Sequence, residues 1–498
     1  MKKEDLLITK LIEYGKTDMY PMHMPGHKRR VRDSVLQDFP NPFSIDITEM
    51  EGFDNLHHPE DLLKDSMEWA ASVYGADQTY YLVNGSSGGI LSAVCAATSS
   101  GGSILISRNC HKSVYHGIIL NRLKSYYVYP QIIEELGIQG GISKDDVEKI
   151  LCKNPDIGAV LIVSPTYDGV VSDIRGIAEA VHAHEIPLIV DEAHGAHFSF
   201  AKDGRFPASA LECGADIVIQ SLHKTLPALT QTAILHVKKG LIRLEKLERY
   251  LQMFQSSSPS YVFMAGIEQC IYELAKHGDE YMNAFAGRLQ RMRMKLSKMQ
   301  ALKLLDQNIV DDNAGRWNVF ALDPSKIVVS CKGCLRKESD GTLVRMDGNQ
   351  LAEMLRDQYH IEMEMCGADY VVAIVTFMDS DEGLDRLCCA LMEIDAALER
   401  QKADERSAGR TVDKLKLPEI RMKIAEAMER DAERLHLWEC EGRISSEFIY
   451  LYPPGIPIVA PGELLTKEIV ERVTEYKDMG LPVQGMADPD AEYLLTLR

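Results

Sequence analysis

The sequence predicts an α/β fold in which helices cover a mostly parallel sheet, with a smaller α+β region toward the carboxyl terminus. Short apolar runs alternate with helical patterns between residues 77 and 237, and this alternation changes beyond about residue 300. Strands buried on both faces appear in a sequence as continuous apolar runs. A helix between two of these runs has apolar residues at i, i+3, i+4 and i+7, namely Ile174, Ile177, Ala178 and Val181.

The strands are predicted from short apolar or β-branched runs with polar or turn residues at both ends. In chain order these runs are 79–83, 104–107, 157–163, 186–190, 216–220 and 232–237. Helices are expected over 90–97 and 174–181. Farther along, 326–330 and 370–376 are predicted strands, and the charged stretch 398–433 is expected to be rich in helices.

Lys224 and Asp191 together supply the two protein groups that pyridoxal phosphate chemistry requires. Lys224 lies beside His223 in a predicted packed turn, a setting that favours the neutral amine needed to attack an aldehyde. Asp191 ends an apolar run and should lie at the carboxyl end of a buried strand, where open α/β sheets bind ligands. A carboxylate there would keep the pyridine nitrogen protonated. Singly, each residue could be a solvated charge or a cap, and only the joint pattern indicates a cofactor site.

The run Asp191-Glu192-Ala193-His194 also matches the DEAH box of nucleotide-driven helicases. Such an enzyme needs a GxxxxGK[ST] phosphate loop upstream. The Gly-Lys-Thr at 15–17 has Lys10 where the first glycine belongs, and the preceding segment reads as a helix rather than a strand. The helicase interpretation therefore fails.

A phosphate site is predicted at Asn84-Gly85-Ser86-Ser87-Gly88, between a predicted strand and a predicted helix. Small residues let backbone N–H groups approach a phosphate, hydroxyls add donors, and the helix dipole favours the anion. A flexible turn is the commoner meaning of such a composition. The position upstream of Asp191 and Lys224 favours the phosphate interpretation.

Further motifs along the chain resemble those of the prokaryotic ornithine/lysine/arginine decarboxylase family of fold type I pyridoxal phosphate enzymes, in its short form without the amino-terminal wing domain. The resemblance implies decarboxylation of a basic amino acid in polyamine metabolism, with arginine favoured over lysine or ornithine. The motif near the carboxyl terminus distinguishes the chain best from ordinary aminotransferases. The motifs are His23-Met24-Pro25-Gly26-His27-Lys28, Asp54-Asn55-Leu56-His57-His58-Pro59, Arg108-Asn109-Cys110-His111-Lys112-Ser113, Ser164-Pro165-Thr166-Tyr167-Asp168-Gly169 and Tyr452-Pro453-Pro454-Gly455-Ile456-Pro457.

The resemblance also implies roles for single residues. His111 stacks on the pyridine ring, although a helix-capping histidine is the plain alternative. Lys224, Asp191, His223 and His111 are the expected catalytic residues, and His223 or Lys224 returns the proton to Cα. The expected cofactor contacts are Ser86, Ser87 and Gly88 with Ser221 and His223 on the phosphate, Ala193 on the other ring face, and His194 in the pocket. The segment 225–231 departs from the family, whose members often carry glycines there.

The resemblance further implies a shared active site. The segment 256–261, which contains Ser258, resembles the part that family members lend to the phosphate site of the neighbouring subunit. A homodimer or larger homo-oligomer is therefore expected. Read from composition alone, the segment is a polar loop.

A basic substrate needs a carboxylate partner for its distal cation. Glu447 is the expected partner, although a glutamate on a helix surface or in a salt bridge is the plain alternative, and Glu362 and Glu364 are weaker candidates. Two other functions stay open. One is another fold type I reaction, such as transamination or carbon–sulfur lysis, and the other is a cofactor-binding regulator, which the lack of a basic DNA-binding module disfavours.

Composition agrees with a globular enzyme of two or three domains, since the 498 residues are 45% hydrophobic and 26% charged. The net charge of −19 makes nucleic acids and anionic membranes poor partners. No apolar run reaches the ~20 residues that span a bilayer, and no signal-peptide core opens the sequence, so a cytoplasmic protein is expected. The 11 cysteines show no disulfide spacing, and Cys331-Lys332-Gly333-Cys334 lacks a second ligand pair, so no metal is expected.

Four regions are expected along the chain. They are an amino-terminal segment over 1–50, a large domain that binds pyridoxal phosphate over 51–300, a small α+β domain over 301–400, and a carboxyl-terminal domain over 401–498.

Overall fold

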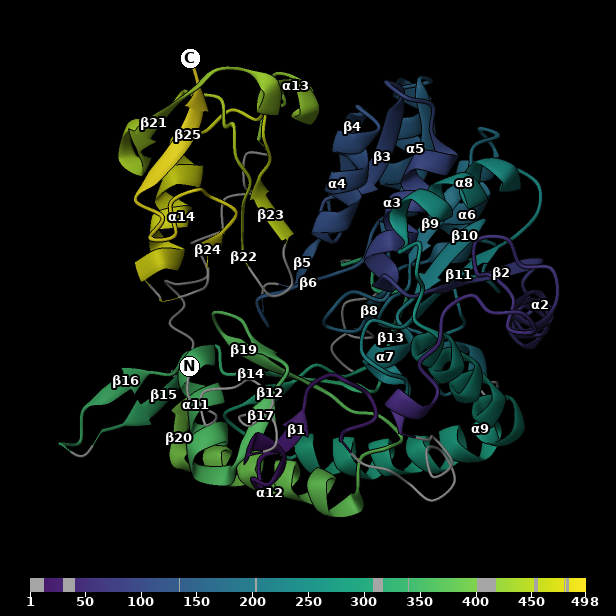
Figure 1. Cartoon of the computed structure of the whole chain (residues 1–498). Coiled ribbons are helices and arrows are strands. Elements are labelled where there is room, and N and C mark those ends of the chain that lie inside the picture. The colour runs from purple at the N-terminus through teal and green to yellow at the C-terminus, as the bar shows by residue number, and fades with distance from the viewer. Residues whose placement is uncertain are drawn as a thin grey trace, which may run out of the picture.

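A computed structural model gives the arrangement of three regions (Figure 1). A central sheet with its helices forms the largest region, a green region of smaller sheets lies below it, and the yellow carboxyl-terminal region lies to one side. The long helix α9 (Tyr261–Leu296) runs beneath the molecule and packs against α12 (Asp381–Ala397). The structure describes residues 13–29, 41–133, 135–201, 204–307, 317–338, 340–400, 418–451, 456–478, 480 and 483–498.

The central sheet has seven strands in the order β2-β11-β10-β9-β7-β3-β4. Strands β4, β3, β7, β9 and β10 are parallel, and β11 is antiparallel to both of its neighbours, so β2 points the same way as the parallel strands. The strands are β2 (Gln78–Leu82), β3 (Ser103–Ser107), β4 (Lys124–Val128), β7 (Ile157–Val163), β9 (Leu188–Asp191), β10 (Ile217–Gln220) and β11 (Ala233–Val237).

Both faces of this sheet are apolar because helices cover both. Successive residues of β7 enter two different buried clusters, with Val160 and Ile162 in one and Ala159 and Leu161 in the other. This alternation explains why the strands read as continuous apolar runs. The helices of this region are α2 (Leu62–Tyr74), α3 (Gly85–Ala97), α4 (Lys112–Leu120), α5 (Lys144–Lys153), α6 (Ile174–His182), α7 (Leu222–Thr225) and α8 (Leu244–Phe254).

The predicted fold class is confirmed, and the predicted strands of the central sheet agree with the observed ones to within two residues at their ends, whereas strand β4 was not predicted. The helix predicted over 90–97 begins earlier, because the Gly/Ser run from Gly85 forms the first turns of α3.

The smaller region contains a four-stranded sheet in the order β12-β14-β19-β18. The amino-terminal segment belongs to this region, because β1 (Tyr20–Met22) pairs in parallel with β17 (Ile361–Met363). Its other elements are β12 (Lys303–Leu304), β14 (Lys326–Ser330), β15 (Cys334–Lys337), β16 (Leu343–Arg345), α11 (Gly348–Tyr359), β18 (Met365–Cys366), β19 (Tyr370–Ile374) and β20 (Leu398–Arg400). Two further pairs of short antiparallel strands lie between the regions or in loops. They are β5 (Ile132–Ile133) with β6 (Ile138–Gln139), and β8 (Val170–Val171) with β13 (Ala321–Leu322).

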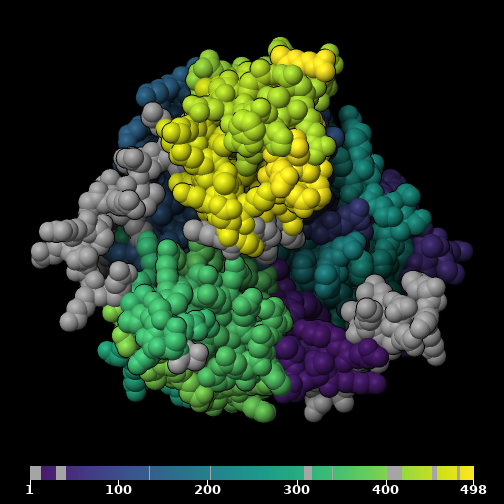
Figure 2. Space-filling model, turned by 90° about the vertical axis from the view of Figure 1, so that its left-hand side faces the viewer, coloured from purple at the N-terminus to yellow at the C-terminus, as the bar shows by residue number. Residues whose placement is uncertain are grey.

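The carboxyl-terminal region has a buried cluster of its own, which includes Leu437, Val459 and Ile469. Figure 2 shows its yellow surface above the green residues of the smaller region. Its elements are α13 (Ile424–Glu429), β21 (Ala432–His436), β22 (Ile449–Leu451), β23 (Ile456–Val459), α14 (Lys467–Asp478), β24 (Val483–Gln484) and β25 (Tyr493–Leu497).

The expectation of a helix-rich stretch over 398–433 is wrong for the residues that the structure describes. These contain strand β20, the short helix α13 and the first residues of β21, which pairs with β25. Residues 452–455 of the Tyr-Pro-Pro-Gly motif lie outside the described residues, and the four domain boundaries stay predictions.

Candidate active site

The predicted cofactor residues lie at one edge of the central sheet. Since β2, β3, β7, β9 and β10 share one direction, their carboxyl ends meet at that edge, which is the ligand-binding edge of open α/β sheets. The segments that follow these five strands are 84–88, 108–111, 164–169, 192–194 and 221–224.

Lys224 lies in α7, directly after β10, with its Nζ atom 2.9 Å from Nε2 of His194. Burial lowers the pKa of Lys224, the Asp191 and Glu364 carboxylates oppose this shift, and the Lys326 ammonium adds to it. Burial and the nearby lysines also hold the pKa of His194 well below its ordinary value, so its ring is neutral. The setting suits a lysine that reacts as a neutral amine.

Asp191 is the last residue of β9 and is 4% exposed. Its Oδ1 atom accepts the backbone N–H of Ala193 at 3.1 Å. Burial raises the pKa of Asp191, and the Lys224 charge opposes that shift. A buried carboxylate requires a cationic or hydrogen-bonding partner, and a protonated pyridine nitrogen is such a partner.

The predicted phosphate loop forms the first turn of α3. Gly85 has a φ of +70°, which favours glycine, and the first amides of a helix have no intrahelical acceptor. The Ser221 hydroxyl donates to Oγ of Ser86 at 2.9 Å, which joins this turn to the Lys224 segment. A Cβ atom at Gly88 would lie 3.3 Å from the Phe254 carbonyl oxygen, so a larger residue there would require a shift of a few tenths of an ångström. Small residues, two hydroxyls and free amides fit a phosphate group.

His223 is the neighbour of Lys224, and its Nδ1 atom lies 2.9 Å from the Thr232 carbonyl oxygen. Because a carbonyl only accepts, Nδ1 carries the hydrogen of the neutral ring. Burial is the main cause that lowers the pKa of His223 to about 4.

His111 is the N-cap of α4, and its Nδ1 atom accepts the backbone N–H of Ser113 at 3.2 Å. Burial, followed by the Lys224 charge, lowers the pKa of His111 to about 3. The capping role that the residues alone suggested is therefore present. The His111 side chain also lies close enough to Lys224 for the lysine charge to lower the pKa of the imidazole.

Two predicted residues make contacts outside this cluster. Ser258 is exposed, and its backbone N–H donates to Oγ of Ser256 at 3.3 Å. Glu447 accepts the backbone N–H of Ala487 on Oε1 at 2.6 Å and that of Leu495 on Oε2 at 2.8 Å. Both carboxylate oxygens of Glu447 thus hold the carboxyl-terminal region together, and its role toward a substrate stays a prediction.

Glu364, a weaker candidate, lies close enough to Lys224 to raise the pKa of that amine. Its Oε2 atom accepts the backbone N–H of Met24 at 2.8 Å, and its Oε1 atom accepts the hydroxyl of Tyr167. The Tyr167 ring lies 4.5 Å from the His194 ring, centroid to centroid. Glu362 instead lies 3.9 Å from the Arg356 guanidinium at the surface.

Sequence reasoning missed the role of the smaller region in this site. Lys326, read as the first residue of a strand, donates from Nζ to the His194 carbonyl oxygen at 3.3 Å. Gly26 donates its backbone N–H to the His223 carbonyl oxygen at 2.8 Å. Tyr167 and Gly26 lie in motifs that the sequence singled out, whereas the Asp-Pro-Ser-Lys run at 323–326 carried no pattern of its own.

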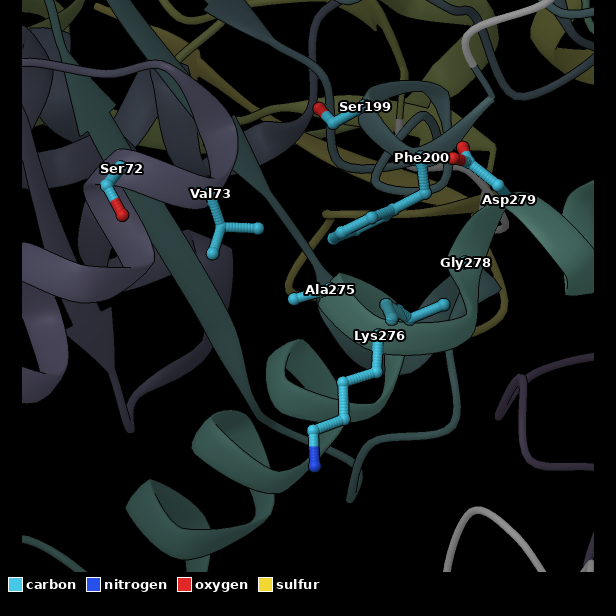
Figure 3. Close-up of a pocket in the computed structure, with 9 residues that line it drawn as sticks. Ser72, Val73, Ser199, Phe200, Ala275, Lys276, Gly278 and Asp279 are labelled. Carbon is cyan, nitrogen blue, oxygen red and sulfur yellow. The ribbon is translucent and has the colours of Figure 1, made fainter.

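No group of three or more His, Cys, Asp or Glu side chains is placed to hold a metal ion among the described residues. Within the same part of the chain, no helix is both long and apolar enough to cross a bilayer. A pocket of about 360 Å³ lies elsewhere, between α2, α9 and the 3-10 turn Phe198–Phe200 (Figure 3). Phe200, Lys276 and Asp279 line it, and no predicted site residue does.

Comparison with known proteins assigns the family. The "Orn/Lys/Arg decarboxylase, major domain" profile matches residues 6–382, and that of the family's C-terminal domain matches residues 410–479. The chain therefore belongs to the Orn/Lys/Arg decarboxylase family.

Curated relatives match nearly end to end. The chain is 33% identical to the arginine decarboxylase of Bacillus subtilis, over 97% of this chain and 96% of the relative. It is 32% identical to that of Bacillus anthracis, over 99% of this chain and 97% of the relative. The inducible lysine decarboxylase of Escherichia coli is 23% identical, over 92% of this chain and 74% of the relative.

Solved structures confirm the fold. The lysine decarboxylase of Francisella novicida superposes with a TM-score of 0.73 at 20% identity, over 98% of this chain and 80% of that one. A ureidoglycine–glyoxylate aminotransferase from Bacillus subtilis superposes with a TM-score of 0.54 at 13% identity, over 76% of this chain and 93% of that one.

Proposed function

We propose that this chain decarboxylates a basic amino acid, arginine in the first place, with pyridoxal phosphate bound covalently through Lys224. The observation that carries the proposal is the hydrogen bond of the Lys224 amine to a neutral His194, beside the buried Asp191 carboxylate at the carboxyl edge of the sheet. Membership of the Orn/Lys/Arg decarboxylase family supports the reaction, and the arginine decarboxylases among its relatives support the substrate.

When bound, pyridoxal phosphate withdraws electrons from the substrate Cα, so that the bond from Cα to the carboxylate can break. The residues of the chain orient the reactants and set charge. Asp191 would hold the proton on the pyridine nitrogen, and Ser86, Ser87, Gly88 and Ser221 would bind the phosphate. His111 would pack on the ring as a neutral side chain, because its pKa lies near 3.

Lys224 is also the better candidate for returning the proton to Cα. The neutral His223 ring has its hydrogen on Nδ1, which is engaged with the Thr232 carbonyl, and its pKa lies near 4. At neutral pH this ring has no second proton to give. The Lys224 amine, which contacts His194, is the remaining candidate.

Glu364 is the best supported partner for the distal cation of the substrate. Its carboxylate lies close enough to raise the pKa of Lys224, whereas the Glu447 carboxylate is occupied by two backbone N–H groups. Each Glu364 carboxylate oxygen can accept a second hydrogen bond from a guanidinium.

Glu364→Gln should raise KM for arginine by roughly ten- to a hundredfold, because a hydrogen bond between two charged groups would be lost. Glu447→Gln should then leave KM unchanged and lower the melting temperature, and a raised KM in this variant would instead return the role of distal partner to Glu447.

The active unit in this proposal is a homodimer in which Ser258 serves the partner's phosphate site. Support comes from the exposed apolar side chains Phe53 and Met253 near the exposed segment 256–258. Mixing an inactive Lys224→Ala chain with an inactive Ser258→Asp chain should restore about a quarter of the native activity, since half of the random dimers regain one intact site. No recovery on mixing would rule out sharing through Ser258.

Product analysis tests the reaction. The purified chain is incubated separately with arginine, lysine and ornithine, and CO2 and the matching amine are measured. Arginine should give CO2 and agmatine at the highest kcat/KM. Release of a keto acid or of sulfide in place of CO2 would favour an aminotransferase or a carbon–sulfur lyase, and no turnover of any kind would favour a regulator.

A further inference from the structure

A second buried lysine lies behind the active site. Lys326 is the first residue of β14, its side chain has no exposed surface, and its Nζ atom lies 2.8 Å from Oδ2 of Asp323. Asp323 is equally buried, and its Oδ1 atom accepts the backbone N–H of Ser325 at 3.0 Å and lies 3.2 Å from Nε2 of His197. Such a pair is stable in an apolar setting only when both charges find partners.

This pair contacts the loop that follows β9. The Lys326 ammonium donates to the His194 carbonyl oxygen at 3.3 Å, while Asp323 contacts His197 three residues farther along. The ring of His194 in turn contacts Lys224 through Nε2 at 2.9 Å. The smaller region therefore fixes both ends of the segment 194–197, which carries the hydrogen-bond partner of the Lys224 amine.

The protonation of His194 follows from its contacts. Its Nδ1 atom is buried without a hydrogen-bond partner in the described structure, and its Nε2 atom contacts Lys224. A hydrogen on Nδ1 would be a buried donor with no acceptor, which costs more than a bare lone pair there. The hydrogen is best placed on Nε2, where it donates to Lys224. A lysine nitrogen accepts a hydrogen bond only when it is uncharged.

We propose that Lys326, paired with Asp323, is a positioning residue of the active site that fixes His194 and keeps the Lys224 nitrogen uncharged. The Lys326 ammonium is not the only charged group near Lys224. The carboxylates Asp191 and Glu364 favour the charged form of Lys224, whereas Lys326 opposes it. The imidazoles of His111, His194 and His223 are also near, and burial keeps each of them neutral.

This proposal rests on the proposed function for its purpose, but its test does not require turnover. The full-length chain, freed of cofactor, is labelled with acetic anhydride over a range of pH, and mass spectrometry follows the peptide that contains Lys224. The labelling rate reports the fraction of uncharged amine. In the native chain Lys224 should titrate at lower pH than exposed lysines, and an ordinary titration there would overturn the proposal whatever the variants do.

Lys326→Met removes the cation, and Asp323→Asn/Lys326→Met removes both charges and so leaves no buried carboxylate unpaired. In either variant the Lys224 titration should shift upward by about one pH unit or more, a tenfold change in protonation. Lys28→Met is the matched control, because Lys28 is also buried and paired, 3.7 Å from Asp379, but is not among the charges that shift the pKa of Lys224.

The control should leave the titration of Lys224 in place. An unchanged titration in a folded Lys326 variant would overturn the proposal, as would an equal shift in the Lys28 variant. A chain that shows the expected shift but releases no CO2 would refute the proposed function and leave the role of Lys326 standing.

Discussion

At the scale of single residues, the site depends on which groups are kept neutral. Lys224 and Asp191 could be predicted because each lies at the carboxyl end of a strand of the parallel sheet, and strand order alone brings their segments to one edge. Sequence reasoning assigned no role in the site to Lys326 and made Glu364 only a weaker candidate. They reach the site from the smaller region, and no local pattern encodes packing between segments more than a hundred residues apart.

Asp191→Asn should keep the fold and lose the reaction. The amide fills the same volume and still accepts the Ala193 N–H, but it cannot hold a proton on a pyridine nitrogen. Turnover should fall by about three powers of ten, equivalent to losing about 4 kcal/mol of transition-state stabilisation. Steady-state kinetics beside circular dichroism measure this, and near-native turnover would remove Asp191 from the mechanism.

Asp168→Asn should stabilise the chain at alkaline pH. Burial raises the pKa of Asp168 to about 7 from 3.8, so its ionised form disfavours folding, and this penalty grows as pH rises from about 4 to 7. At pH 8 the variant should gain roughly 2 to 4 kcal/mol in unfolding free energy. Denaturant unfolding at pH 4 and pH 8 checks this. An equal gain at both values would exclude titration of Asp168 as the cause.

At the scale of elements, the strap over residues 20–28 couples the smaller region to the turn that carries Lys224. Gly26 donates its N–H to the His223 carbonyl oxygen at 2.8 Å and accepts the Thr376 hydroxyl on its own carbonyl oxygen at 2.8 Å. The sequence singled out this motif without indicating its contacts. The sequence also predicted a helix-rich stretch over 398–433, where the described residues form β20, the short helix α13 and the start of β21, because charge pattern alone does not distinguish helices from exposed strands.

Gly26→Ala should disturb Lys224 from a distance. An added Cβ atom would lie 2.7 Å from the Leu226 carbonyl oxygen and 2.9 Å from its nitrogen, so either the strap or α7 must move. We expect kcat to fall about tenfold or more, as for a small misplacement of a catalytic group. Gly15→Ala is the control, since nothing lies within 4 Å of that position. Equal kinetics in the two variants would show that the strap does not position α7.

At the scale of the whole molecule, the carboxyl-terminal region is held to the central sheet beside the His111 segment. The Arg108 guanidinium, which follows β3, donates to both oxygens of Glu463 at 2.6 and 2.9 Å and lies over the Tyr127 ring. A second pair, Arg122 with Glu429, also joins the two regions but is exposed to solvent. The sequence predicted a separate carboxyl-terminal region, but not these partners.

Glu463→Gln should destabilise the chain strongly, because it leaves the Arg108 cation buried without its counter-charge. The expected loss in unfolding free energy is about 3 kcal/mol. Glu429→Gln breaks the exposed pair and should leave that free energy unchanged, since solvent screens such pairs. Denaturant unfolding of both variants makes the comparison, and equal losses would contradict the dominant role of the buried pair.

The most direct test of the central claim is to identify the lysine that binds the cofactor. The purified chain should absorb visible light, and borohydride should abolish that band while fixing the coenzyme irreversibly to one side chain. Mass spectrometry of the digested protein should then find the pyridoxyl group on Lys224. A pyridoxyl group on any other lysine, or a chain that binds no pyridoxal phosphate, would contradict the account.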